Sequence, residues 1–136
     1  MRPTVLADTG PLYAAVDPHD SQHPRAQQDL KRLATDRRDV VIAYPTVLEA
    51  YTLVLHRLGN HIAEGWLRDI LTGAALINPT PEDYREGFKK LAAFPDQSVT
   101  LFDATVAVLA TRLGCEVWTY DRHFDMMRTA VWRRLS

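Results

Sequence analysis

The chain has 136 residues, of which 46% are hydrophobic and 24% are charged, a composition ordinary for one globular domain. No apolar stretch approaches the roughly 18 residues of a membrane span, and the N-terminus lacks the basic start and long apolar run of a signal peptide. The net charge of −1 argues against strong nonspecific DNA binding, and the single cysteine excludes an intrachain disulfide. We therefore expect a single domain over residues 1–136 that lies in the cytoplasm and not in a membrane.

Short apolar runs alternate with segments of helical periodicity along the chain. In chain order, the pattern predicts a strand at 3–7, a turn at Gly10–Pro11, a helix at 20–36, a strand at 39–44, helices at 45–58 and 60–73, a strand at 74–78, a helix from Thr80 to Ala92, a helix at 98–114 and a strand at 115–120. The segment AVWRRL at 130–135 is either a last strand or a tail. Strands that alternate with helices indicate the α/β class, with a mostly parallel sheet of 4–5 strands flanked by helices on both faces.

Four carboxylates are predicted to meet at one edge of this sheet. Asp8 and Asp121 each come directly after a predicted strand. Glu49 and Asp103 each lie in or near the first turn of a predicted helix. In an open parallel sheet, strands end and helices begin at the edge where ligands bind. Because converging carboxylates repel one another, a divalent cation that prefers oxygen ligands, such as Mg²⁺, would explain this arrangement.

Each of these acidic residues also has an ordinary structural interpretation when it is taken alone. Asp8 would cap the helix that follows it, and Asp103 would interact with the dipole at its helix N-terminus. Glu49 would be a solvated helical residue, and Asp121 would be a turn residue. The predicted convergence of all four favours a metal site over these separate interpretations.

The triplet DTG, which begins at Asp8, also occurs at the active site of aspartic proteases. Retroviral-type proteases of similar length consist mostly of β-strands, whereas this chain has at least four strong helical patterns. A phosphatase with an aspartyl nucleophile would usually carry a second aspartate two residues later, where this chain has Gly10. The sequence therefore favours neither of these enzyme classes.

The order and spacing of the motifs resemble those of PIN-domain nucleases, and in particular the VapC-type toxins of bacterial toxin–antitoxin pairs. The matching stretches are DTGPL, the glutamate in PTVLEAYTLVL, the helix LFDATVAVLATRLG and the later VWTYDRHFD. The most specific feature is an F-D-A helix start that lies 18 residues before the aspartate of a T-x-D-x-x-F motif. The resemblance covers nearly the whole chain and implies the PIN fold.

This resemblance implies a role for each acidic residue. Asp8, Glu49 and Asp103 match the three principal acidic positions, and Asp121 matches a fourth that varies more in type among such proteins. All four would be catalytic and would bind one or two Mg²⁺ or Mn²⁺ ions. Asp125 is a further acidic residue near the fourth position, and whether Asp121 or Asp125 completes the site stays open.

Other residues are implied to support these ligands. Thr9 and Thr119 match small hydroxyl positions beside the site. Phe102 stands where some relatives have a polar residue, so a hydroxyl at that point would have to come from Thr100. Of the five histidines, only His123 is expected near the acidic edge.

The activity that the resemblance implies is that of a metal-dependent endoribonuclease toxin. Its substrate would be single-stranded or loop RNA, for example tRNA, rRNA or mRNA, and Arg112 and Arg122 are candidates for holding the strand. A cognate small DNA-binding antitoxin would restrain it by laying a segment across the acidic cleft. The alternatives are a PIN nuclease with a housekeeping role in RNA processing and a catalytically inactive binding module.

The resemblance also implies a homodimer. Helices 45–58 and 60–73 are the candidates for its interface, with Trp66 and Leu67 as candidate exposed residues. Sequence alone does not separate an interface from the core at these positions.

Overall fold

A four-stranded sheet forms the centre of the computed structural model, which describes residues 3–95 and 97–133. The strands are β1 (Thr4–Ala7), β2 (Asp39–Ala43), β3 (Ala75–Ile77) and β4 (Glu116–Trp118). All pairings are parallel in the order β3-β2-β1-β4, and Leu6 of β1 is in register with Val41 and with Val117. The predicted parallel sheet is therefore confirmed, with β1 at its centre.

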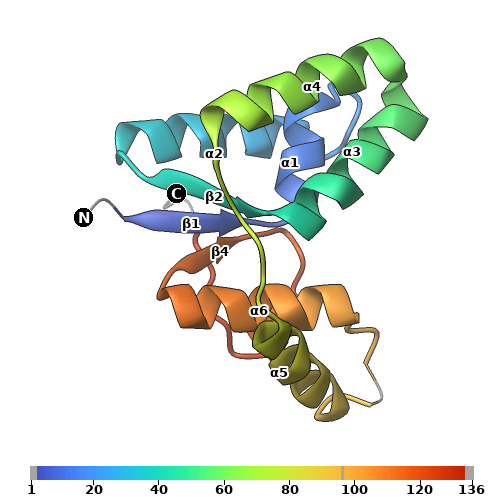
Figure 1. The fold of residues 1–136 in the computed structure, drawn as a ribbon. Helices are drawn as coiled ribbons and strands as arrows, with labels where there is room; N and C mark the ends of the chain where they lie inside the picture. Colours follow the sequence, from blue (N-terminus) through green and yellow to red (C-terminus); the bar gives the residue numbers. More distant parts are fainter. Residues whose placement is uncertain (1–2, 96, 134–136) are drawn as a thin grey trace.

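Helices cover both faces of this sheet. They are α1 (Thr9–Val16), α2 (His23–Thr35), α3 (Tyr44–Leu58), α4 (Asn60–Gly73), α5 (Pro81–Ala92), α6 (Leu101–Leu113) and the short α7 (His123–Met126). Helices α1 to α4 lie on one side of the sheet, and α5 and α6 lie on the other (Figure 1). Among the described helices, each is too short or too polar to cross a bilayer.

The alternation of side chains along β1 divides the core into two halves. Val5 and Ala7 are fully buried against the layer of α1 to α4, together with Trp118 and Trp132. Leu6 is fully buried on the opposite face, against α6 and α7. Successive residues of a strand point to opposite faces, so a strand buried on both faces reads as the continuous apolar run seen in the sequence.

Two segments differ from the sequence prediction. The turn predicted at Gly10–Pro11 is wrong, because α1 begins there at Thr9; proline is tolerated in a first helical turn, where its missing N–H costs no hydrogen bond. In the segment 130–135, only Val131 forms an isolated bridge with Val117, so it is not a fifth strand over its described residues. Residues 134–136 lie outside the described part of the chain.

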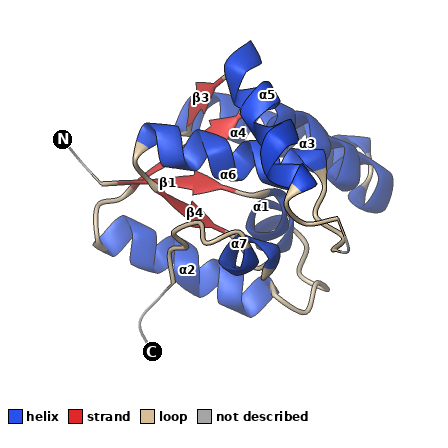
Figure 2. Ribbon diagram, turned by 90° about the horizontal axis from the view of Figure 1, so that it is seen from below, coloured by secondary structure: helices blue, strands red, loops and turns tan. Residues whose placement is uncertain are grey.

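The connections between helices and strands bring the acidic residues to one end of the sheet. Gly114 ends α6 in the left-handed conformation, with φ of 68°, which returns the chain directly into β4. The first and last strands then finish side by side, and α1 and α7 follow them at that end (Figure 2). The carboxyl edge of the sheet thus collects residues from both ends of the sequence.

Candidate metal centre

Asp8 follows the end of β1 and directly precedes α1. It occupies the N-cap position of α1, yet its side chain makes no capping hydrogen bond, so the capping interpretation is wrong. Instead, the Thr119 hydroxyl donates a 2.8 Å hydrogen bond to Asp8 Oδ2. The same hydroxyl oxygen accepts a 3.0 Å hydrogen bond from the backbone N–H of Asp121. Thr119 therefore fixes the position of Asp8 relative to Asp121.

Asp103 is held at the start of α6 by a reciprocal capping box. Its Oδ2 atom accepts a 3.2 Å hydrogen bond from the Thr100 backbone N–H, and Thr100 Oγ1 accepts a 3.0 Å bond from the Asp103 backbone N–H. Both bonds leave the other carboxylate oxygen of Asp103 available for a ligand. Capping and metal binding are thus compatible at this residue, and Thr100 supplies the nearby hydroxyl.

The tightest group of potential metal ligands among the described residues is Asp103, Asp121 and His123. Each of the three offers one ligand atom, and these atoms lie within 4.8 Å of one another. Asp121 Oδ1 accepts a 2.9 Å hydrogen bond from the His123 backbone N–H and lies 2.9 Å from His123 Nδ1. Sequence reasoning placed His123 near the site without assigning it a ligand role. Its position two residues after Asp121 was the available signal.

Glu49 lies in α3, close enough to Asp103 for the two charges to interact. The residue is exposed, unlike Asp8 and Asp103, which are 6% and 9% exposed. Partial burial of the carboxyl group raises the pKa of Glu49, and the negative charge of Asp103 raises it further. Glu49 therefore borders the buried group and belongs to its electrostatic field.

Burial and mutual repulsion disfavour the ionised forms of these carboxyl groups. Burial raises the pKa of Asp8 to about 6, against hydrogen bonds from Thr119 and Thr9, and the charges of Asp103 and Asp121 raise it further. Burial likewise raises the pKa of Asp103, against the hydrogen bonds from Thr100, and Asp121 adds to the rise. A divalent cation would reverse this penalty. The carboxylate oxygens of Asp8, Asp103 and Asp121 suit Mg²⁺ or Mn²⁺, so these residues fit the predicted metal.

Two residues predicted to support the site, Thr9 and Asp125, and the RNA-binding candidate Arg122 lie close in the chain to its acidic residues. Thr9 is 7% exposed, and its buried Oγ1 atom has no hydrogen-bond partner among the described residues. Asp125 lies in α7 and pairs with Arg133. Arg122 is exposed and directly follows Asp121.

Arg112, the other predicted RNA-binding residue, lies in the last turn of α6, at the opposite end of that helix from Asp103. Its guanidinium makes two 2.8 Å hydrogen bonds to the buried carboxylate of Asp83 in α5. The structure thus places Arg112 in an ion pair between two helices and away from the acidic group.

Comparison with protein families matches residues 5–129 to the PIN domain. The chain is a PIN domain. PIN domains are typically nucleases, and this one carries the candidate metal centre described above. No curated protein gives a significant match to the chain.

Solved structures share the fold of this PIN domain at low sequence identity. VapC20 of Mycobacterium tuberculosis, a sarcin-ricin loop cleaving toxin, has a TM-score of 0.82 and 20% identity, covering 96% of this chain and 99% of that one. VapBC2 of Rickettsia felis, solved with a promoter DNA fragment, has a TM-score of 0.73 and 13% identity, and the match covers 94% of this chain and 96% of that one. FitAcB of Neisseria gonorrhoeae has a TM-score of 0.68 and 18% identity, and the match covers 95% of this chain and 96% of that one. The likeness extends over the full length of each chain.

Proposed function

We propose that this PIN domain is a metal-dependent endoribonuclease of the VapC toxin type, acting on single-stranded or loop RNA in the cytoplasm. The observation that carries the proposal is the convergence of the buried Asp8 and Asp103 with the half-buried Asp121, from three separate parts of the chain, into one mutually repelling group. Such an arrangement is costly for a folded protein unless a cation neutralises it. The full-length likeness to VapC20 supports the RNA-cleaving assignment.

Asp8, Asp103 and Asp121 would hold Mg²⁺ or Mn²⁺, with His123 beside them. A bound ion would lower the pKa of a water molecule and stabilise charge on the scissile phosphate. The protein fixes the geometry, because Thr119 orients Asp8 and the capping box orients Asp103. Glu49 or Asp121 would take up a proton from that water; burial and the charge of Asp103 raise the pKa of Glu49, which favours its uptake of a proton.

The experiment that tests this function is cleavage of single-stranded RNA by the purified chain with Mn²⁺ or Mg²⁺. We expect cleavage by the wild type, with loss in EDTA and in the Asp8→Asn variant. Glu64→Gln is the matched control, because Glu64 is an exposed acidic residue of α4 outside the centre. Full activity of Asp8→Asn, or activity undiminished by EDTA, would contradict the proposal. A chain that binds Mn²⁺ and RNA without cleavage would favour the inactive binding module.

A cognate antitoxin belongs to this proposal, because VapBC2 and the VapBC-1 of Haemophilus influenzae share the fold. The antitoxin would lie across the acidic edge and bring a basic side chain to the carboxylates. An adjacent small reading frame that encodes a DNA-binding protein would support this. Co-expression should then give a stable complex whose RNA cleavage is blocked. Free, active chain recovered after co-expression would favour a housekeeping nuclease.

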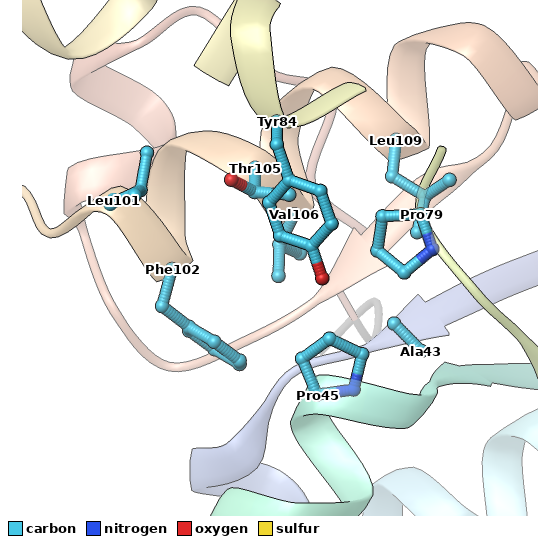
Figure 3. Close-up of a pocket in the computed structure, with 9 residues that line it drawn as sticks. All are labelled: Ala43, Pro45, Pro79, Tyr84, Leu101, Phe102, Thr105, Val106 and Leu109. Carbon is cyan, nitrogen blue, oxygen red and sulfur yellow. The ribbon is translucent and has the colours of Figure 1, made fainter. Parts of the chain in front are cut away.

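The homodimer also remains a proposal, and the exposed apolar side chains favour different residues for its interface from those expected. Trp66 is 8% exposed and packs in the core, so the expectation that it is exposed is wrong. Leu48 of α3 and Phe88 of α5 are instead 69% and 66% exposed. An apolar cavity of about 200 Å³ opens between α6 and the same two helices, α3 and α5, with Tyr84 and Phe102 in its walls (Figure 3).

We propose that this apolar surface of α3, α5 and α6 packs against a second copy of the chain. The Phe88→Asp variant should then sediment as a monomer at concentrations where the wild type is a dimer. Leu71→Asp is the control, because Leu71 is 55% exposed and lies on α4, away from the cavity. A Phe88→Asp variant that stays dimeric would exclude this interface.

A further inference from the structure

A small hollow lined by arginines lies beside the acidic group. It is formed by α2, the segment after β4, α7 and the chain that follows α7, and has a volume of about 80 Å³. The lining residues that matter here are Arg25, Tyr120, Asp121, Arg122, Asp125 and Arg133. We call it the arginine hollow. It shares Asp121 with the metal centre, so the two sites adjoin.

Arg25 is held in the arginine hollow by a chain of contacts that begins in the core. The Tyr120 hydroxyl donates a 2.6 Å hydrogen bond to Oδ2 of Asp29, a buried residue of α2. The guanidinium carbon of Arg25 lies 4.0 Å from the centre of the Tyr120 ring. Stacking on a ring that is itself fixed orients the planar guanidinium and reduces the entropy lost when it binds a ligand.

The charges in the arginine hollow do not cancel. Arg133 is paired with Asp125, and Asp121 belongs to the metal centre. Within residues 3–95 and 97–133, no carboxylate lies within ion-pair distance of the guanidinium of Arg25 or Arg122. Two guanidinium groups therefore present hydrogen-bond donors and positive charge at the mouth of the arginine hollow.

We propose that the arginine hollow binds a backbone phosphate of the RNA strand, next to the phosphate that is cleaved at the metal centre. The inference rests on the proposed function and names a part of the substrate that the acidic group does not hold. Guanidinium groups bind phosphate oxygens through paired, charge-assisted hydrogen bonds. A polar hollow of this size suits one anionic group better than a nucleobase. Arg25 and Arg122 would be its ligands, and Tyr120 a positioning residue.

The test measures RNA binding separately from cleavage. All variants are made in an Asp103→Asn background, which blocks cleavage, and a short fluorescein-labelled single-stranded RNA of mixed sequence is titrated at several salt concentrations. Arg25→Ala and Arg122→Ala should each weaken binding by about tenfold and reduce the slope of log affinity against log salt by about 0.7. Arg25→Lys should restore the slope but only part of the affinity, because lysine keeps the charge without the planar fork.

Lys31→Ala is the matched control, because Lys31 is an exposed basic residue of the same helix, α2, outside the arginine hollow. Its affinity and salt slope should equal those of the parent. If Arg25→Ala and Arg122→Ala bind RNA as Lys31→Ala does, the arginine hollow is not a phosphate site, although the nuclease proposal stands. If the parent does not bind RNA and the wild type does not cleave it, both proposals fail together.

Discussion

Two buried aspartates, one at each end of helix α6, share the same capping motif but have opposite electrostatic surroundings. Asp103 begins α6 in a capping box with Thr100, and Asp83 begins α5 in a capping box with Thr80. Hydrogen bonds from Arg112, which lies at the far end of α6, lower the pKa of Asp83. Burial raises the pKa of Asp103, and the negative charge of Asp121 raises it further.

The difference shows that a capping motif does not decide what a buried aspartate does. Asp83 finds its countercharge in an arginine of the same protein, so its negative charge helps to join α5 to α6. Asp103 has no lysine or arginine partner among the described residues, and Asp121 repels its charge, so a bound cation would supply the missing countercharge. A buried acidic residue without an internal cation is therefore the better indicator of a ligand site.

The largest expected effect is a difference in RNA cleavage between the Asp→Asn variants of the two aspartates. Asp103→Asn should reduce RNA cleavage by about 10³-fold, because it removes a charged ligand from the metal centre. Asp83→Asn, the same change in the other capping box, should retain cleavage at a temperature where the variant is folded. Steady-state cleavage of single-stranded RNA measures both. Equal loss in the two variants would indicate that the acidic group acts only through stability.

Metal binding should also stabilise the variants of the two aspartates to different degrees. At a Mn²⁺ concentration about 100 times the dissociation constant, the wild type should gain about 2.7 kcal/mol in free energy of unfolding. Asp103→Asn should gain much less, whereas Asp83→Asn should gain as much as the wild type. Thermal-shift titrations read this directly. Wild-type protein that millimolar Mn²⁺ fails to stabilise would refute the metal centre.

Removing the guanidinium of Arg112 should lower the stability of the fold and leave RNA binding unchanged. Arg112→Ala strands the Asp83 carboxylate, which is 2% exposed, so the free energy of unfolding should fall by about 2 kcal/mol. Urea denaturation measures this loss, and the RNA-binding assay should show no change. Weaker RNA binding by the folded Arg112→Ala variant would restore Arg112 as the RNA contact that the sequence analysis suggested.

The smallest effect concerns acid stability. The pairing with Arg112 lowers the folded-state pKa of Asp83 below its ordinary value of 3.8. The ion pair therefore stabilises the fold fully at pH values above 3.8. This stabilisation is lost as the pH falls through the folded-state pKa. The wild type should therefore lose more stability than Arg112→Ala as the pH falls below about 4. Denaturation curves at a series of acidic pH values test this sign. A loss of equal size in both proteins would show that the pair contributes nothing.

Periodicity and spacing in the sequence were enough to predict the parallel sheet, most helices and the edge at which Asp8, Glu49, Asp103 and Asp121 gather. These features depend on local pattern and on the general geometry of parallel sheets. Helix α1 was missed because glycine and proline in DTGPL also indicate a turn, and only packing against α2 and α3 resolves the choice.

Contacts between distant segments could not be predicted in the same way. Trp66 lies on an amphipathic helix, and nothing in the helical pattern says whether that stripe faces the core or a partner. The arginine hollow depends on Tyr120 and Asp29, which are 91 residues apart. Likewise, the sequence does not reveal that Arg112 is paired, because its partner Asp83 lies on a different helix.

The hydroxyl of Thr119 has a consequence for the order in which the candidate metal centre is assembled during synthesis of the chain. It joins Asp8, near the start of the chain, to the segment that follows the last strand. Strand β1 lies between β2 and β4, so the carboxyl edge is incomplete until β4 has paired. On a ribosome, a nascent chain that has exposed β1 to α5 therefore still lacks the ligands from α6 onward. The candidate metal centre is therefore assembled only after α6 and β4 have been synthesised and have packed against β1.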